Sequence, residues 1–237
     1  MTIISLLLLA SLLPHLTFTV NGTEAKPHSR PYMVSLQDNR QHKCGGFLIS
    51  DRFVMTATHC KKKHVTLTAV IGAHDLTKSE GSVCIGVESY HKHLDFKRRT
   101  MQNDIMLLKL EKKGEQNEIV KIISIPTQEG DIKPDSVCSY NGVKSKHLME
   151  ADVKIMNKTE CENKWKDKYS ASWMMCVYSH GGSCSGDSGG PLVCGDTAVG
   201  VTSFGGGKEC NSREQPEVYT KISAYIPWIH SIIANVK

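Results

Sequence analysis

The stretch Cys184-Ser185-Gly186-Asp187-Ser188-Gly189-Gly190-Pro191 decides how this 237-residue chain is interpreted. Glycine permits backbone conformations and close approaches that a side chain would block. A serine in such a turn can expose its hydroxyl while neighbouring backbone N–H groups point into one concavity. A nucleophile beside a pocket of donors is what acyl transfer requires. Alone, the octapeptide also fits a plain glycine-rich turn, so the interpretation depends on partners for Ser188.

Two such partners stand upstream of the serine. His59 stands in Thr56-Ala57-Thr58-His59-Cys60, which closes a run of alternating apolar residues that indicate a half-buried strand. Asp104 stands in Asn103-Asp104-Ile105-Met106-Leu107-Leu108, just ahead of a strongly apolar strand. The order histidine, aspartate, serine along the chain is that of the chymotrypsin triad.

On these three motifs the chain resembles the chymotrypsin-fold (trypsin-like) serine proteases. Residues 24–33, Glu-Ala-Lys-Pro-His-Ser-Arg-Pro-Tyr-Met, and the run around Asp104 narrow the resemblance to the granzymes, the mast-cell proteases and cathepsin G. The similarity runs from about Val20 to the C-terminus. It implies an all-β fold of two six-stranded antiparallel β-barrels, with the active site in the cleft between them and a short C-terminal α-helix.

The expected organisation is a signal peptide at residues 1–18 and a protease domain at residues 19–237. Short apolar runs between turn residues are typical of β-barrels, and the resemblance places the barrels at about 31–112 and 119–224. The polar run 112–118 is expected to link the two barrels. After Pro227, apolar residues at helical spacing predict a helix at about 227–236, expected to pack on the second barrel.

The resemblance assigns a role to each catalytic residue. Ser188 would be the nucleophile, His59 the base that takes its proton and returns it to the leaving amine, and Asp104 the group that fixes the histidine tautomer. The backbone N–H groups of Gly186 and Ser188 would receive the oxyanion. The chain holds 11 histidines, and for most of them a surface or packing role is the simpler interpretation.

Asp187 has a separate expected role, because carboxylates are rarely buried unless they are paired. In the resembling family this residue meets the amino group of the mature N-terminus, and the ion pair shapes the oxyanion hole. The sequence departs from the family there. The usual start resembles Ile-Ile-Gly-Gly, whereas this chain reads Thr19-Val20-Asn21-Gly22, with threonine in place of the apolar first residue.

The resemblance places the substrate-binding residues at Gly182, Ser203, Gly205 and Glu217. Gly182 would form the floor of the primary pocket, where trypsin-like enzymes carry an aspartate. Glu217 stands where many relatives have glycine, and an acid there favours a basic or dual basic and large apolar preference, as in cathepsin G. The alternative is that Glu217 turns to solvent or pairs with Arg213, which would leave an apolar pocket.

The chain has nine cysteines, which with a signal peptide indicate disulfides formed in an oxidising compartment. Spacing does not fix their connectivity. The resemblance implies four pairs and leaves Cys84, which lies in an apolar run, as a buried and inert thiol or, less simply, an intermolecular bridge. The implied pairs are Cys44–Cys60, Cys138–Cys194, Cys161–Cys176 and Cys184–Cys210.

Composition and charge limit the classes of partner that we expect for this chain. The apolar run in the first 13 residues is too short to span a bilayer and fits a secretory signal, so we expect a secreted or granule protein without a membrane anchor. The formal net charge is +5, and a basic surface would attract acidic proteoglycans. We also expect protein substrates, protein protease inhibitors and a monomeric chain. No cofactor, metal site or nucleic-acid module is indicated.

Two smaller features of the sequence concern a loop after Cys138 and possible glycosylation. Members of the resembling family usually carry Gly-Trp-Gly after the cysteine at 138, whereas this chain has Gly142 followed by Val143, so the loop lacks the tryptophan that packs it in the family. Asn157-Lys158-Thr159 and Asn21-Gly22-Thr23 are glycosylation sequons, of which Asn157 is the better candidate.

The leading hypothesis is therefore a serine endopeptidase. The alternative is a catalytically silent homologue that acts as a basic, polyanion-binding or defence protein. The intact trio His59, Asp104 and Ser188 argues against the alternative, and the altered N-terminus argues for it. A third hypothesis is a disulfide-rich structural module without an active site. It would require the three motifs to occur in this order by chance.

Overall fold

Short strands with buried apolar side chains close the first half of the chain into a barrel. The computed structural model describes residues 22–78, 81–142, 146–178, 187–205 and 214–236. Six antiparallel strands close this barrel in the order β2-β3-β4-β7-β6-β5. They are β2 (Met33–Asp38), β3 (Gln41–Leu48), β4 (Phe53–Thr56), β5 (Thr68–Ile71), β6 (Val83–Lys92) and β7 (Met106–Leu110).

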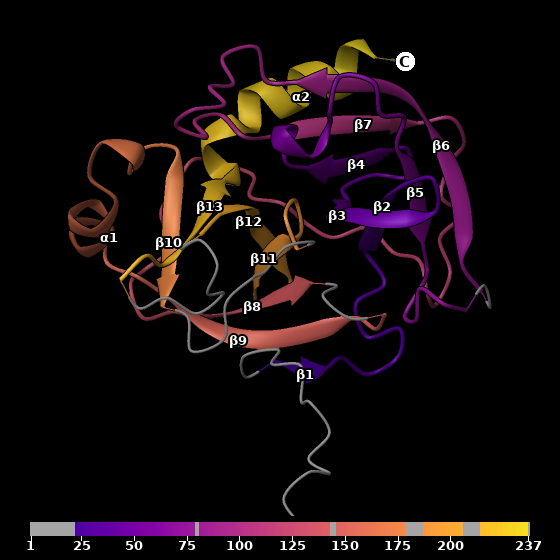
Figure 1. Ribbon diagram of the computed structural model, residues 1–237, viewed down its shortest axis with the longest axis horizontal. Coiled ribbons are helices and arrows are strands. Elements are labelled where there is room, and N and C mark those ends of the chain that lie inside the picture. The colour runs from indigo at the N-terminus through magenta and orange to yellow at the C-terminus, as the bar shows by residue number, and fades with distance from the viewer. Residues whose placement is uncertain (1–21, 79–80, 143–145, 179–186, 206–213, 237) are drawn as a thin grey trace, which may run out of the picture.

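The second half forms a matching barrel. Its strands follow one another in the order β9-β10-β13-β12-β11-β8, and β8 also pairs with β9, which closes the ring. They are β8 (Val137–Gly142), β9 (Met149–Ile155), β10 (Met174–Tyr178), β11 (Pro191–Cys194), β12 (Thr197–Phe204) and β13 (Glu217–Lys221). The short β1 (Thr23–Glu24) pairs with the start of β9, beyond the part that pairs with β10. The expected fold of two six-stranded antiparallel barrels is confirmed, and Figure 1 shows them side by side.

The largest buried core cluster lies in the first barrel and continues into the second. It includes Phe47, Met55 and Leu107 from the first barrel and Val201 from β12, all of them essentially inaccessible to solvent. A continuous core fixes the two barrels against each other. That contact matters for function, because the candidate catalytic residues come from both.

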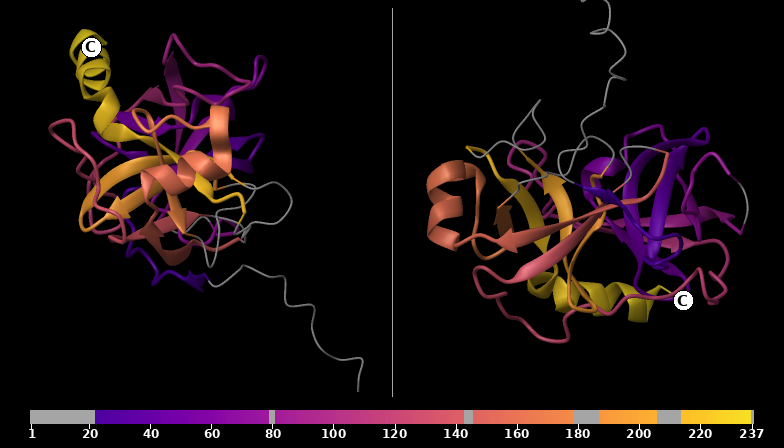
Figure 2. Two further views of the ribbon diagram at one scale, coloured as in Figure 1. Left: turned by 90° about the vertical axis from the view of Figure 1, so that its left-hand side faces the viewer. Right: turned by 90° about the horizontal axis from the view of Figure 1, so that it is seen from below.

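The C-terminal helix α2 (Ile226–Asn235) follows the short 3₁₀ turn η3 (Ile222–Tyr225), in agreement with the expected helix. Its expected packing on the second barrel is wrong. Ile229 belongs to the core cluster built mainly from the first barrel, and the ring centroids of Trp228 and His93 lie 5.4 Å apart. The helix leaves the second barrel at β13 and runs across to the first, as the lower-side view in Figure 2 shows. Among the described residues, none of the helices is long and apolar enough to cross a membrane.

A second helix, α1 (Lys158–Trp165), was not expected from the sequence. It carries few apolar residues, and only Cys161 and Trp165 are buried. Asn157 caps it by accepting a 2.9 Å hydrogen bond from the Thr159 backbone N–H, so local capping chemistry starts the helix. A single 3₁₀ turn, η2 (Lys166–Lys168), follows it. The Trp165 ring packs edge-on against Phe204 at the end of β12, with centroids 4.9 Å apart.

Three of the four expected disulfides are present: Cys44–Cys60, Cys138–Cys194 and Cys161–Cys176. The fourth, Cys184–Cys210, lies outside the described residues.

The expectation of a buried Cys84 is wrong, because its free thiol is exposed. Cys84 stands on β6, where it pairs with Val70, and side chains alternate between the two faces of a strand. Ile85 and Val87 on β6 are buried in the barrel, and Cys84 takes the opposite face.

Candidate active site

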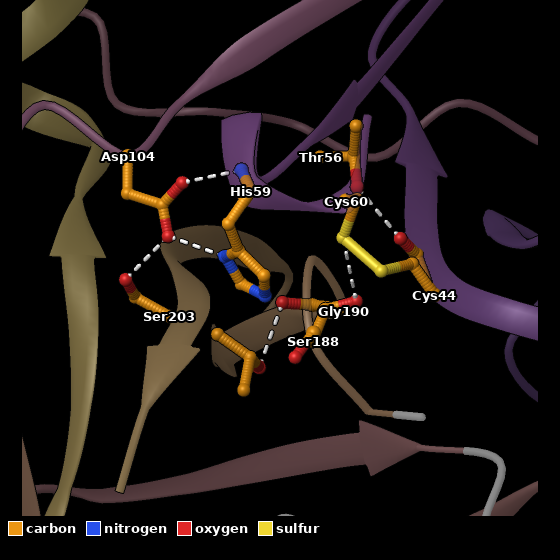
Figure 3. The surroundings of a disulfide bond; sticks show 10 residues. Cys44, Thr56, His59, Cys60, Asp104, Ser188, Gly190 and Ser203 are labelled. Atoms are coloured by element: carbon orange, nitrogen blue, oxygen red, sulfur yellow. Dashed lines mark hydrogen bonds and ion pairs between the residues drawn. A yellow bond between two sulfur atoms is a disulfide. The ribbon is translucent and has the colours of Figure 1, made fainter. Parts of the chain in front are cut away.

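The carboxylate of Asp104 is the best-connected group of the site. Asp104 is fully buried just ahead of β7. Its Oδ1 accepts a 2.9 Å hydrogen bond from the backbone N–H of His59, and its Oδ2 lies 2.6 Å from His59 Nδ1. The Ser203 hydroxyl donates to the same Oδ2 at 2.6 Å (Figure 3). Three donors therefore compensate a buried negative charge that would be costly alone.

The backbone around Asp104 is held by residues of the second barrel and the C-terminal segment. Asn103 has φ +57°, a left-handed conformation that asparagine tolerates. Its side chain accepts a 2.9 Å hydrogen bond from the Tyr225 hydroxyl and donates one of 2.9 Å to the Asp95 carbonyl. Thr220 Oγ1 donates to the Asp104 carbonyl at 3.0 Å. These bonds fix the direction in which the carboxylate points.

His59 lies on η1 (Thr58–Cys60), the single 3₁₀ turn that follows β4. Two contacts anchor this turn. The Thr58 hydroxyl donates to the Ile105 carbonyl at 2.7 Å, and the neighbouring Cys60 is bonded to Cys44 on β3. Because Nδ1 of His59 faces the Asp104 carboxylate, the other ring nitrogen is the one available to a substrate or a nucleophile. In the view of Figure 3 the imidazole lies between Asp104 and Ser188.

Ser188 lies on a tight turn, with Asp187 before it and Gly189 and Gly190 after it. The turn closes through a 2.9 Å bond from the Gly190 N–H to the Asp187 carbonyl. It is attached to both barrels: the Gly45 N–H on β3 donates to the Ser188 carbonyl at 2.8 Å, and the Gly189 N–H donates to the Thr202 carbonyl on β12 at 2.8 Å. The candidate nucleophile is therefore fixed to both halves of the molecule.

Gly189 is required in this turn for two reasons. Its φ is +82°, which disfavours any residue with a side chain. A Cβ added there would overlap the Thr56 hydroxyl and lie 2.6 Å from the Gly45 carbonyl oxygen. The glycine next to Ser188 therefore has a specific structural reason.

Asp187 is buried, with 1% of its surface exposed. Its Oδ2 accepts a 3.0 Å hydrogen bond from the hydroxyl of Tyr140 on β8. The expected ion pair with the mature N-terminus is not tested, because Thr19 and Val20 lie outside the described residues. The same holds for Gly186, the other expected oxyanion donor.

The specificity residues fall partly within the described chain. Glu217 is 5% exposed, so the alternative in which it turns to solvent is wrong. A Cβ added to Gly205 would overlap the Glu217 carboxylate, which shows that the acid lies against the backbone of Gly205. Gly182 and Arg213 lie outside the described residues.

The sequence did not indicate several supporting residues. Ser203 was expected only as a residue that binds substrate, and its hydroxyl is bonded to Asp104. Thr58, Thr220 and Tyr140 were not singled out, since isolated threonines and tyrosines carry no pattern. The sequence indicates them only in that each is a hydroxyl residue beside or within an apolar strand, where a buried hydroxyl needs a hydrogen-bond partner.

Within the described residues, one trio of potential metal ligands comes together: His59, Cys44 and Cys60, whose donor atoms lie within 4.8 Å of one another. Both sulfurs belong to a disulfide, so neither is a thiolate able to bind a metal. The grouping instead shows how closely the disulfide flanks the imidazole.

Comparison with known proteins agrees with this architecture. The family model described as Trypsin matches residues 19–229. Granzyme-like protein 2 of Rattus norvegicus is 37% identical over 222 residues, which cover 88% of this chain and 87% of that protein. Mast cell protease 3 of Ovis aries is 36% identical over 233 residues, covering 92% and 90%. Granzyme B(G,H) of Mus musculus is 35% identical over 225 residues, covering 89% of each.

Among solved structures, neuropsin, a serine protease expressed in the limbic system of mouse brain, superposes with a TM-score of 0.83. It is 32% identical in sequence, and the match covers 90% of this chain and 99% of neuropsin. The chain therefore belongs to the trypsin family of serine endopeptidases, in the group of the granzymes and mast cell proteases.

Proposed function

We propose that the chain hydrolyses peptide bonds through an acyl-enzyme intermediate formed on Ser188. The observation that carries the proposal is the buried Asp104 carboxylate 2.6 Å from His59 Nδ1, on the side of the imidazole away from Ser188 in Figure 3. A serine hydroxyl is a weak nucleophile until a base removes its proton. His59 would take that proton as Ser188 attacks the carbonyl carbon, and would then pass it to the leaving amine.

Asp104 would act without changing its own protonation state. Bonded to Nδ1, it keeps the proton of a neutral imidazole on that nitrogen and stabilises the imidazolium formed during attack. The oxyanion would be received by the backbone N–H groups of Ser188 and Gly186. Loss of one such donor typically raises the barrier by about 3–4 kcal/mol.

Cleavage after basic residues, or after both basic and large apolar residues, is the preference that we propose for the primary pocket. Glu217 is the support for it, because a buried carboxylate is a strong partner for a lysine or arginine side chain. Gly205, against which Glu217 lies, directly follows β12 and is two residues after Ser203, whose hydroxyl contacts Asp104. An acid in this position disfavours cleavage after aspartate.

We further propose that the chain is secreted or stored in granules, with residues 1–18 removed as a signal peptide. Three disulfides among the described residues support an oxidising compartment. The net charge of +5 supports binding to acidic proteoglycans, and protein protease inhibitors are the other expected partners.

The test is a peptide panel with lysine, arginine, phenylalanine, leucine or aspartate before the scissile bond, incubated with the secreted chain and with Ser188→Ala. We expect cleavage after lysine and arginine that Ser188→Ala abolishes. No turnover above the Ser188→Ala control would favour the silent homologue. Retention of heparin binding by Ser188→Ala would show that a polyanion-binding surface acts independently of catalysis.

A further inference from the structure

The residue before the candidate nucleophile is an acid in an unusual position. Asp187 is buried, yet it begins the turn that carries Ser188, because its carbonyl accepts the N–H of Gly190 at 2.9 Å. Any rotation of the Asp187 backbone therefore moves the Ser188 N–H. A buried carboxylate tolerates little freedom, since it must keep its hydrogen-bond donors.

Strand β8 provides one of these donors. Tyr140 is 5% exposed, and its backbone is held on both sides, by Leu192 of β11 and Ala151 of β9. Its hydroxyl donates to Asp187 Oδ2 at 3.0 Å. A tyrosine held by two neighbouring strands presents its hydroxyl at a fixed point, which makes it a rigid donor to the carboxylate.

The same strand also provides the space for the acid. A Cβ added to Gly142, two residues after Tyr140, would overlap Asp187 Oδ1 and lie 2.9 Å from the Tyr140 ring. Between them, Asn141 is fully buried and accepts a 3.0 Å bond from the Tyr32 hydroxyl. The end of β8 therefore forms a defined seat for the Asp187 carboxylate.

The protonation state of Tyr140 suits this role. Burial, and then the negative charge of Asp187, raise the pKa of the Tyr140 hydroxyl far above its ordinary value. The phenol therefore stays protonated, and remains a donor, over the whole range in which proteases work.

We propose that Tyr140 is a positioning residue: by holding Asp187, its hydroxyl sets the backbone of the Asp187–Gly190 turn and with it the oxyanion donor at Ser188. The inference rests on the proposed function of Ser188. The Tyr140 hydroxyl is a partner for Asp187 whether or not the N-terminus has been processed. This partner matters here because the chain reads Thr19-Val20 where the mature start of the family resembles Ile-Ile.

The first experiment compares Tyr140→Phe with Tyr169→Phe. Tyr169 is a matched control, since it is also buried in the second half of the chain and donates its hydroxyl to a backbone carbonyl, that of Met174 at 3.2 Å. Each rate is divided by the concentration of active sites, which is measured by titration with a fluorophosphonate. We expect Tyr140→Phe to lower kcat about tenfold with KM changed less than about twofold, and Tyr169→Phe to change neither. An unchanged kcat per titrated site in Tyr140→Phe would overturn the proposal.

The second experiment does not depend on catalysis. Amide hydrogen exchange is followed at Gly189 and Gly190, whose N–H groups donate to Thr202 and Asp187. We expect at least tenfold faster exchange in Tyr140→Phe and no change in Tyr169→Phe. Unchanged exchange in Tyr140→Phe would contradict the proposal even if the enzyme is active. If the wild-type chain has no turnover, the proposed function fails, and exchange still decides whether Tyr140 orders the turn.

Discussion

The hydroxyl of Ser203 and Nδ1 of His59 both lie 2.6 Å from the same oxygen of Asp104. His59 belongs to the first barrel and Ser203 to β12 of the second, so this oxygen connects the two halves of the molecule at the candidate active site. The other carboxylate oxygen is occupied by the His59 backbone N–H. The carboxylate is thus oriented before any substrate arrives.

Removal of the Ser203 hydroxyl tests this orientation. Hydrogen bonds to charged groups contribute about 1.5–3 kcal/mol, so we expect Ser203→Ala to lower kcat about tenfold while the chain stays folded. The measurement is steady-state kinetics on the best peptide of the panel. Ser223→Ala is the control, because Ser223 donates a similar 2.8 Å bond to the Gly130 carbonyl. Equal effects of the two changes would show that the loss is structural.

Gly189→Ala tests the requirement for glycine beside Ser188. Strain at φ +82° and overlap with the Thr56 hydroxyl should destabilise the chain by at least about 1–3 kcal/mol and abolish turnover. Gly195→Ala is a matched control, since Gly195 also has positive φ, +61°, but a Cβ there meets no atom within 4 Å. Urea denaturation and peptide turnover are measured for both variants. If Gly189→Ala is no worse than Gly195→Ala, the close packing of the turn is not important.

Glu217→Gln tests the specificity proposal with little change in side-chain shape. The neutral amide should lower kcat/KM after lysine and arginine about tenfold or more, because a charge-assisted contact is lost, and leave cleavage after phenylalanine nearly unchanged. The ratio of the two rates is the measurement, since it cancels differences in active fraction. A uniform decrease for all peptides would place Glu217 in a structural role instead.

Tyr140 should also affect alkaline stability. Its pKa is raised in the folded chain by burial and by the charge of Asp187, whereas in the unfolded chain a tyrosine ionises near pH 10. The hydroxyl therefore stabilises the fold fully below about pH 10, and this contribution is lost at higher pH as the unfolded state releases its proton. Tyr140→Phe should lose less stability than wild type between about pH 9 and pH 11 in urea denaturation. Parallel decreases for the two proteins would contradict the assignment.

Much of the fold could be predicted because its signals are local or family-wide. Alternating apolar runs such as residues 53–57 indicate strands, and the resemblance arranged those strands in two barrels, as the structure has them. Helix α1 was missed because an asparagine cap starts it and a disulfide cysteine anchors it, not an apolar stripe. The course of α2 was missed because its apolar face suits the core of either barrel, and only the geometry of the chain after β13 selects the first.

The site was predicted at the level of motifs but not of contacts. His59 and Asp104 were found from their flanking sequences, and the structure brings them into hydrogen-bond contact. Ser203, Thr220 and Tyr140 act through single hydroxyl groups that meet partners 47 to 116 residues away. Such bonds depend on the pairing of distant strands and leave no local pattern. The exposure of Cys84 likewise depends on the register of β6, and the burial of Glu217 on that of β13.

The most direct test of the account is covalent labelling by a fluorophosphonate, read by intact mass and peptide mapping on the secreted chain. We expect one adduct per chain, on Ser188, formed at a rate that falls at least about a thousandfold in His59→Ala. Tyr169→Phe should be labelled at the wild-type rate. An adduct on another residue, or no adduct on a folded chain in which the three described disulfides are intact, would contradict the claim that Ser188 is a nucleophile activated by His59.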